Sequence, residues 1–83
     1  MVTIHRQFGL RFAIYTDDHE PAHVHVIGDG EMKVVIRGAG ELPEMVYKTG
    51  FKARDRRRAM EVVRERQDEF LVRWDEIQGR KTK

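Results

Sequence analysis

The chain has 83 residues, of which 40% are apolar and 36% are charged, and its formal net charge is +2. This length supports one hydrophobic core, and the composition is typical of a folded domain. The absence of cysteine excludes disulfides, thiolate metal sites and a cysteine nucleophile. No stretch approaches the roughly 18 apolar residues that cross a bilayer. We therefore expect one cytoplasmic domain over residues 1–78, with no membrane contact, and a flexible tail at 79–83.

The first half of the chain predicts an antiparallel sheet, because short β-rich runs alternate in polarity and are separated by Gly, Pro and Asp. The expected strands cover residues 2–6, 10–16, 22–27 and 31–37, with a weaker candidate near residues 45–48. Residues 53–78 predict one long helix, since apolar side chains recur there at helical spacing. The expected fold class is therefore α+β, with an antiparallel sheet of about four strands and one C-terminal helix packed on one face.

The expected helix has a continuous apolar stripe and an unusual start. The stripe contains Ala59, Met60, Val62, Val63, Phe70, Leu71, Trp74 and Ile77. Its spacing places Trp74 in the core rather than in a ligand site. The residue before the helix is Lys52, which cannot cap the first turn as Ser, Thr, Asp or Asn would. The position of the helix start is therefore less firmly predicted than the helix itself.

The segment Gly28-Asp29-Gly30 joins two expected strands and sets their register. A two-residue turn would place His25 opposite Val34 and mix polar with apolar residues on both faces. A three-residue loop with Gly30 in a left-handed conformation pairs Val26 with Met32 and His25 with Lys33. We prefer this second register, because it separates a polar face from an apolar face.

Positive charge is concentrated in the last third of the chain. Residues 1–50 contain five Lys or Arg and seven Asp or Glu, whereas residues 51–83 contain eleven and seven. The densest run, Arg54 with Arg56, Arg57 and Arg58, spans a full helical turn. This run predicts a solvated helix end, and contact with nucleic acid is the alternative.

The most concentrated chemical signal is the group His19, His23 and His25. His23 and His25 lie on the same side of a predicted strand, about 7 Å apart by strand rise, and His19 comes just before it. Four carboxylates, from Asp17, Asp18, Glu20 and Asp29, are close in sequence. The three histidines are therefore candidate ligands of a divalent metal ion. The alternative is a pair of ordinary hydrogen-bonded strand histidines.

A second reading of the same face needs no metal. In the preferred register, His23 and His25 share one polar face with Lys33 and Arg37, and Tyr15 and Arg11 lie on the neighbouring strand. The candidate ligand-binding residues are Tyr15, His19, His23, His25, Lys33 and Arg37, for RNA or another phosphate-bearing ligand. If the protein is an enzyme, His23 and His25 are the candidate general base and general acid.

Several segments together resemble a known family. They are residues 15–26 (YTDDHEPAHVHV), residues 30–33 (GEMK), Gly50-Phe51 and residues 74–76 (WDE). The chain resembles the small bacterial and archaeal proteins of the domain of unknown function 4160 family, which typically carry Pro-Pro-His-Val-His-Val. His23, His25 and Lys33 fall on the family pattern, Ala22 replaces the second proline, and Lys52 stands where a serine helix cap is common.

The resemblance implies a partner rather than a reaction. Members of that family are often encoded beside another small uncharacterised protein, which implies a two-component module of toxin–antitoxin type. Our leading hypothesis is a small binding protein that works with such a partner and binds RNA or another phosphate-bearing ligand. The alternatives are a ribonuclease-like or metal-dependent hydrolase that uses His23 and His25, and a structural protein–protein interaction module.

Overall fold

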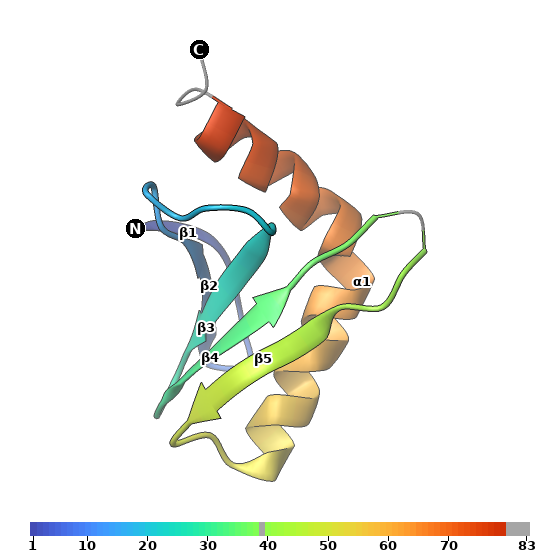
Figure 1. The fold of residues 1–83 in the computed structure, drawn as a ribbon. Coiled ribbons are helices and arrows are strands. Elements are labelled where there is room, and N and C mark those ends of the chain that lie inside the picture. The colour runs from blue at the N-terminus through green and yellow to red at the C-terminus, as the bar shows by residue number, and fades with distance from the viewer. Residues whose placement is uncertain (39, 80–83) are drawn as a thin grey trace.

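The computed structural model describes residues 1–38 and 40–79 (Figure 1). The elements are β1 (Val2–Gln7), β2 (Leu10–Ile14), β3 (His23–Ile27), β4 (Glu31–Val35), β5 (Glu44–Thr49) and α1 (Ala53–Gln78). The strands form one antiparallel sheet in the order β1-β2-β3-β4-β5. The predicted α+β fold is confirmed, with five strands instead of about four. Of the expected flexible tail at 79–83, residues 80–83 lie outside the described part.

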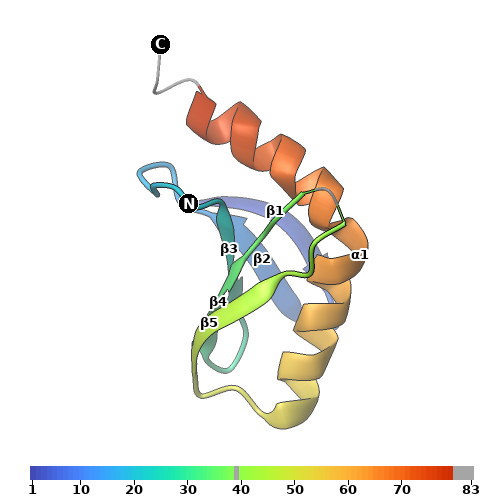
Figure 2. The same cartoon turned by 45° about the vertical axis from the view of Figure 1, so that its right-hand side comes forward.

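The molecule has two layers, because α1 crosses one face of the twisted sheet and leaves the other face open (Figure 2). Alternate residues of the central strands point toward the helix, as β geometry requires. The core consists of Leu10, Phe12, Ile14, Val24, Val26, Met32, Val34, Ile36, Phe51, Ala59, Val62, Val63, Phe70 and Trp74. Trp74 is a buried core residue, which confirms its predicted place.

The predicted register between β3 and β4 is confirmed: Val26 pairs with Met32, and His25 pairs with Lys33. The predicted left-handed conformation of Gly30 is wrong, because its φ is not positive. Close packing explains this glycine instead. A Cβ on Gly30 would overlap the carbonyl oxygen of Thr49 and lie 2.8 Å from Gly50. The turn after β3 is thus pressed directly against the chain that leads into α1.

The helix begins at Ala53 and ends at Gln78, as predicted. Lys52 forms no side-chain cap, and the helix is kinked at Arg66, whose φ and ψ are −111° and 16°. The next residue, Gln67, is buried and bonds to the connection between β4 and β5: its side chain accepts from the Arg37 amide at 2.8 Å and donates to the Glu41 carbonyl at 2.7 Å. No pattern in the sequence predicts this polar link. No helix in the described ranges is long and apolar enough to cross a membrane.

The sheet has two ends that carry different side chains. The histidine end contains the β2–β3 connection, the start of β3 and the last turns of α1 (Figure 1). The arginine end contains the β1–β2 turn, the β3–β4 turn and the first turns of α1. Polar side chains gather at both ends, and the two sets differ in burial and in pairing.

Candidate metal centre

His23 and His25 alternate along β3 with Val24 and Val26, and only the two valines belong to the hydrophobic core. Both histidines are nevertheless buried, with exposures of 4% and 7%. The reason is that neighbouring side chains cover them. The Tyr15 ring stacks on His25 with centroids 4.1 Å apart, and the His23 ring lies 5.1 Å from the Trp74 ring.

Asp18 reaches the two histidines from the β2–β3 connection. Two reciprocal hydrogen bonds fix its place: its amide donates to the Tyr15 carbonyl, and its Oδ2 accepts from the Tyr15 amide, both at 3.1 Å. The Tyr15 carbonyl also accepts a bond of 2.8 Å from the side chain of Gln78 in the last turn of α1. This connection therefore holds the Asp18 carboxylate beside β3 by backbone contacts.

The Nδ1 atom of each histidine has a partner that can only accept a hydrogen bond. For His23 it is the Pro21 carbonyl oxygen at 2.8 Å, and for His25 it is the Glu31 carboxylate at 3.1 Å. Each Nδ1 therefore carries the proton, an assignment that follows from the bonding partners. In a neutral ring this leaves the Nε2 lone pair free.

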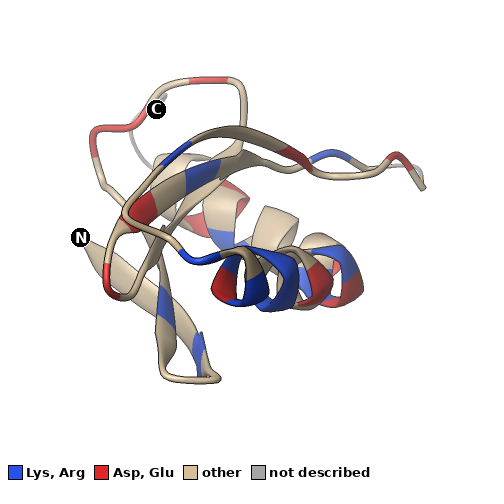
Figure 3. Ribbon diagram, turned by 90° about the horizontal axis from the view of Figure 1, so that it is seen from below, with Lys and Arg blue, Asp and Glu red and all other residues tan. Residues whose placement is uncertain are grey.

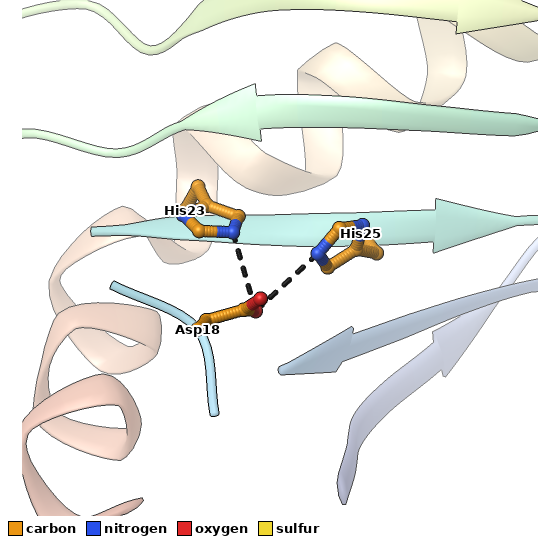
Figure 4. Close-up of side chains that lie close together, drawn as sticks. All are labelled: Asp18, His23 and His25. Carbon is orange, nitrogen blue, oxygen red and sulfur yellow. Dashed lines mark ion pairs between the residues drawn. The ribbon is translucent and has the colours of Figure 1, made fainter. Parts of the chain in front are cut away.

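Both free Nε2 atoms converge on one carboxylate oxygen (Figure 4). The distance to Asp18 Oδ2 is 3.2 Å from His23 and 3.3 Å from His25. The His25 Nε2 atom is buried and forms no hydrogen bond among the described residues, although Asp18 Oδ2 lies 3.3 Å away. A buried nitrogen without a partner is costly, so this atom marks a place where a further group belongs.

The three converging atoms fit a divalent transition metal ion. Asp18, His23 and His25 are the one group in the described ranges whose metal-ligating atoms lie within 4.8 Å of one another. Two ligands held about 2.0–2.1 Å from a tetrahedral zinc ion lie about 3.3–3.4 Å apart, close to the separations between Asp18 and each histidine. Two imidazoles and one carboxylate also form the donor set of many zinc and non-haem iron sites.

Glu31 and two tyrosines support this group from the outer face of the sheet. The Glu31 carboxylate accepts from His25 Nδ1 and, at 3.5 Å, from the Tyr47 hydroxyl. The pKa of Tyr15 is raised above its usual value, mainly by burial and then by the negative charges of Glu31 and Asp18. The positive charge of Arg11 lowers the same pKa and partly offsets the rise. Burial and then Glu31 also raise the pKa of Tyr47. Both phenols therefore stay neutral at physiological pH, and Tyr47 acts as a donor.

The structure brings together some of the predicted site residues and separates others. Tyr15, His23 and His25 touch, and Lys33 is paired with His25 across the strands. His19 is exposed and lies outside the ligand group, although it lines a hollow of about 420 Å³ beside Asp18. Arg37 lies two residues beyond the end of β4, and its side chain forms an ion pair of 2.7 Å with Glu44. The predicted face is thus split between a buried group and an exposed edge.

Sequence reasoning did not single out two residues of this site. Asp18 was one of four nearby carboxylates, and nothing in the sequence distinguished it from Asp17. Glu31 had a usable signal, since the preferred register puts it opposite Ile27 on the face that holds His25. Its bond to His25 runs diagonally across the strands, and diagonal neighbours lie within reach of long side chains.

Comparison with known proteins identifies a family and adds no activity. No curated protein and no solved structure matches the chain. The family model described as "Domain of unknown function (DUF4160)" matches residues 9–75, a range that contains β2 to β5, most of α1 and the triad of Asp18, His23 and His25. The chain therefore belongs to the domain of unknown function 4160 family.

Proposed function

We propose that this protein is a metal-binding domain in which Asp18, His23 and His25 hold one divalent transition metal ion, with zinc the best match to the donors. The observation that carries the proposal is the convergence of both Nε2 atoms on Asp18 Oδ2. Each histidine donates its Nδ1–H to an oxygen atom. This is the usual second contact of a metal-ligating histidine.

The main competitor is a proton on each ring, so that two imidazolium groups share one carboxylate. That arrangement places two positive charges in a buried site against the Asp18 carboxylate, helped by Glu31 at 40% side-chain exposure. It also requires His25 Nε2 to donate toward Asp18, and the geometry does not form that bond. A metal ion satisfies both lone pairs and the carboxylate at once, so the metal is the better account.

The donor set also supports hydrolytic chemistry as an extension of this proposal. Three protein ligands are typical of catalytic zinc sites, which keep a fourth position for water, whereas structural sites usually have four protein ligands. Asp18 lines the hollow of about 420 Å³ that separates the β2–β3 connection from the end of α1. A metal-free ribonuclease that uses His23 and His25 fits less well, because the buried His25 Nε2 atom cannot contact an RNA backbone.

Isothermal titration of the metal-free protein with Zn²⁺ tests the proposal. We expect one site per chain in the wild type. Asp18→Asn keeps an oxygen for the Tyr15 amide and removes the charge, so it should weaken zinc binding at least 100-fold. His19→Ala is the matched control, because His19 belongs to the same connection but not to the ligand group, and it should bind zinc like the wild type.

Two outcomes would count against the metal assignment, and a third would count against its hydrolytic extension. Absence of zinc binding would favour the doubly protonated pair, and a loss with His19→Ala equal to that with Asp18→Asn would place the metal outside the triad. For the hydrolytic extension, the zinc-loaded wild type should cleave bis(p-nitrophenyl) phosphate faster than Asp18→Asn does under the same conditions. Equal rates for the wild type and Asp18→Asn would remove that extension while leaving metal binding intact.

Partnership with a second small protein and binding of RNA on the His/Lys/Arg face remain predictions of the sequence. Lys33 is the member of that face best placed for a ligand, since it is partly exposed and forms no ion pair in the described ranges. Arg37 is engaged with Glu44, and the histidines are covered. Phosphate recognition on this face would therefore depend on Lys33 rather than on the histidines.

A further inference from the structure

An exposed aromatic side chain occupies an unfavourable place at the arginine end. Phe8 and Gly9 form the two-residue turn between β1 and β2, with φ values of 57° and 73°. Such turns favour Asn followed by Gly, and a bulky residue at positive φ is an outlier. The Phe8 side chain is also 49% exposed, so core packing does not account for it. An exposed phenylalanine in a strained position points to a function in binding.

One arginine of α1 contacts this ring, and further basic residues precede it in the chain. The Arg58 guanidinium lies over the Phe8 ring, 5.0 Å from its centroid, which is a cation–π contact. Lys52, Arg54 and Arg57 are exposed nearby in the chain at the start of α1, and Figure 3 shows these basic turns facing the viewer. None of the basic residues from 52 to 58 has an ion-pair partner among the residues that the structure describes.

A hollow lies beside the ring. It measures about 520 Å³, and Arg6, Phe8, Arg11, Asp29 and Asp55 contribute to its lining. The Nε atom of Arg11 is buried without a hydrogen bond among the described groups. The two carboxylates would repel a phosphate at the centre of the hollow, but they can accept bonds from the amino group of a nucleobase.

We propose that the arginine end binds single-stranded nucleic acid, with a base stacked on Phe8 and its amino edge directed at the carboxylates of the hollow. The arginines at the start of α1 would contact the flanking phosphates. Aromatic rings beside basic side chains are the usual means of binding single strands. The site is separate from the metal centre, so binding should persist in EDTA.

Single strands fit this surface better than its two rivals. A duplex keeps its bases stacked and offers nothing to an exposed phenylalanine. An acidic peptide would pair with the arginines but would be repelled by Asp29 and Asp55. Its Asp and Glu side chains also have no flat ring to stack on Phe8. The combination of an aromatic ring, a basic rim and carboxylate acceptors therefore favours an unpaired base.

Fluorescence anisotropy with labelled 15-nucleotide oligocytidine RNA, in EDTA and low salt, tests the proposal. Phe8→Asn is a favourable variant, because Asn at this turn position relieves the strain and should preserve or raise stability. It should nevertheless weaken binding about 5- to 100-fold, the range expected for loss of one stacked base. Phe8→Tyr should restore binding, and Arg58→Gln should weaken it.

Matched controls separate this site from general charge attraction. Arg73→Gln removes one arginine at the other end of α1, where it pairs with Glu76, and should leave affinity within about twofold. Oligocytidine should bind more tightly than oligouridine, because only cytosine presents an amino group to the carboxylates. Equal affinity for oligocytidine and oligouridine would contradict the proposed placement of the base edge in the hollow.

Several results would overturn the proposal as a whole. They are an absence of binding at low salt, unchanged affinity of Phe8→Asn, or tighter binding of a 15-base-pair RNA duplex than of the single strand. Tighter binding of poly-glutamate than of the oligonucleotide, insensitive to Phe8→Asn, would assign this end to an acidic protein partner. Because the assay contains EDTA, none of these outcomes bears on the metal centre.

Discussion

The histidine end and the arginine end of the sheet organise polar residues in opposite ways. At the histidine end, the side chains of His23 and His25 are buried and bonded through Nδ1, and they meet Asp18. At the arginine end, Lys52, Arg54 and Arg57 are exposed, and the local structure depends on backbone packing, as at Gly30. A buried polar group requires a partner, whereas an exposed one has water. A buried unpaired atom, such as His25 Nε2, is therefore informative, whereas an unpaired group that is exposed is ordinary.

The largest expected effect concerns the backbone contact at the arginine end. Gly30→Ala would force a Cβ against the Thr49 carbonyl, so it should lower the free energy of unfolding by about 3 kcal/mol or more. Gly38→Ala is the control, because a Cβ there meets only a Leu71 methyl group at 3.7 Å. Urea unfolding measures both, and equal small losses would show that the turn does not pack as described.

The next effect concerns metal loading at the histidine end. Zinc at 100 times its dissociation constant should stabilise the folded state by about 2.7 kcal/mol. For a domain of this size, that corresponds to a rise in melting temperature of about 10–20 °C. Circular dichroism with and without zinc measures it. Asp18→Asn should show no comparable rise, and a rise equal to that of the wild type would contradict the triad.

A smaller effect is expected from the residue behind His25. Glu31→Gln keeps an acceptor for His25 Nδ1 and removes the negative charge, so it should weaken zinc binding about 10- to 100-fold. Glu44→Gln is the matched control, because Glu44 is an exposed carboxylate that pairs with Arg37 instead. Calorimetry of the two variants decides the point. Equal affinities would mean that Glu31 does not support the metal ligand.

The smallest effect tests whether the two ends are independent. Gln67→Met removes the link between α1 and the β4–β5 connection, and it should cost about 1 kcal/mol in unfolding free energy, since the freed Arg37 amide and Glu41 carbonyl lie near solvent. Zinc and oligonucleotide affinities should stay within about twofold. A large loss of zinc affinity would show that the histidine end depends on the middle of α1, and a large loss of oligonucleotide affinity would show the same for the arginine end.

Most of the fold was predictable because its signals are periodic. The alternation along β3 and β4 gave the register, and the apolar spacing gave α1 with Trp74 in the core. The fifth strand was a weak prediction, since Pro43 and Gly40 interrupt the approach to β5 and its own burial pattern is mostly exposed.

The candidate site was only partly predictable, because its decisive contacts are tertiary. The sequence placed His23 and His25 on one face, but it did not predict that Tyr15 and Trp74 would cover them. The choice of Asp18 over its neighbours depends on two backbone bonds to Tyr15 in an irregular connection. Propensity and periodicity carry no information about such bonds, so the third ligand required coordinates.

The most direct test of the metal centre is a crystal structure of the zinc-loaded protein with diffraction data collected on both sides of the zinc absorption edge. The account predicts an anomalous peak about 2.0–2.2 Å from a carboxylate oxygen of Asp18 and from Nε2 of both His23 and His25. A zinc peak elsewhere, or none at the triad with both rings bonded directly to Asp18, would contradict it.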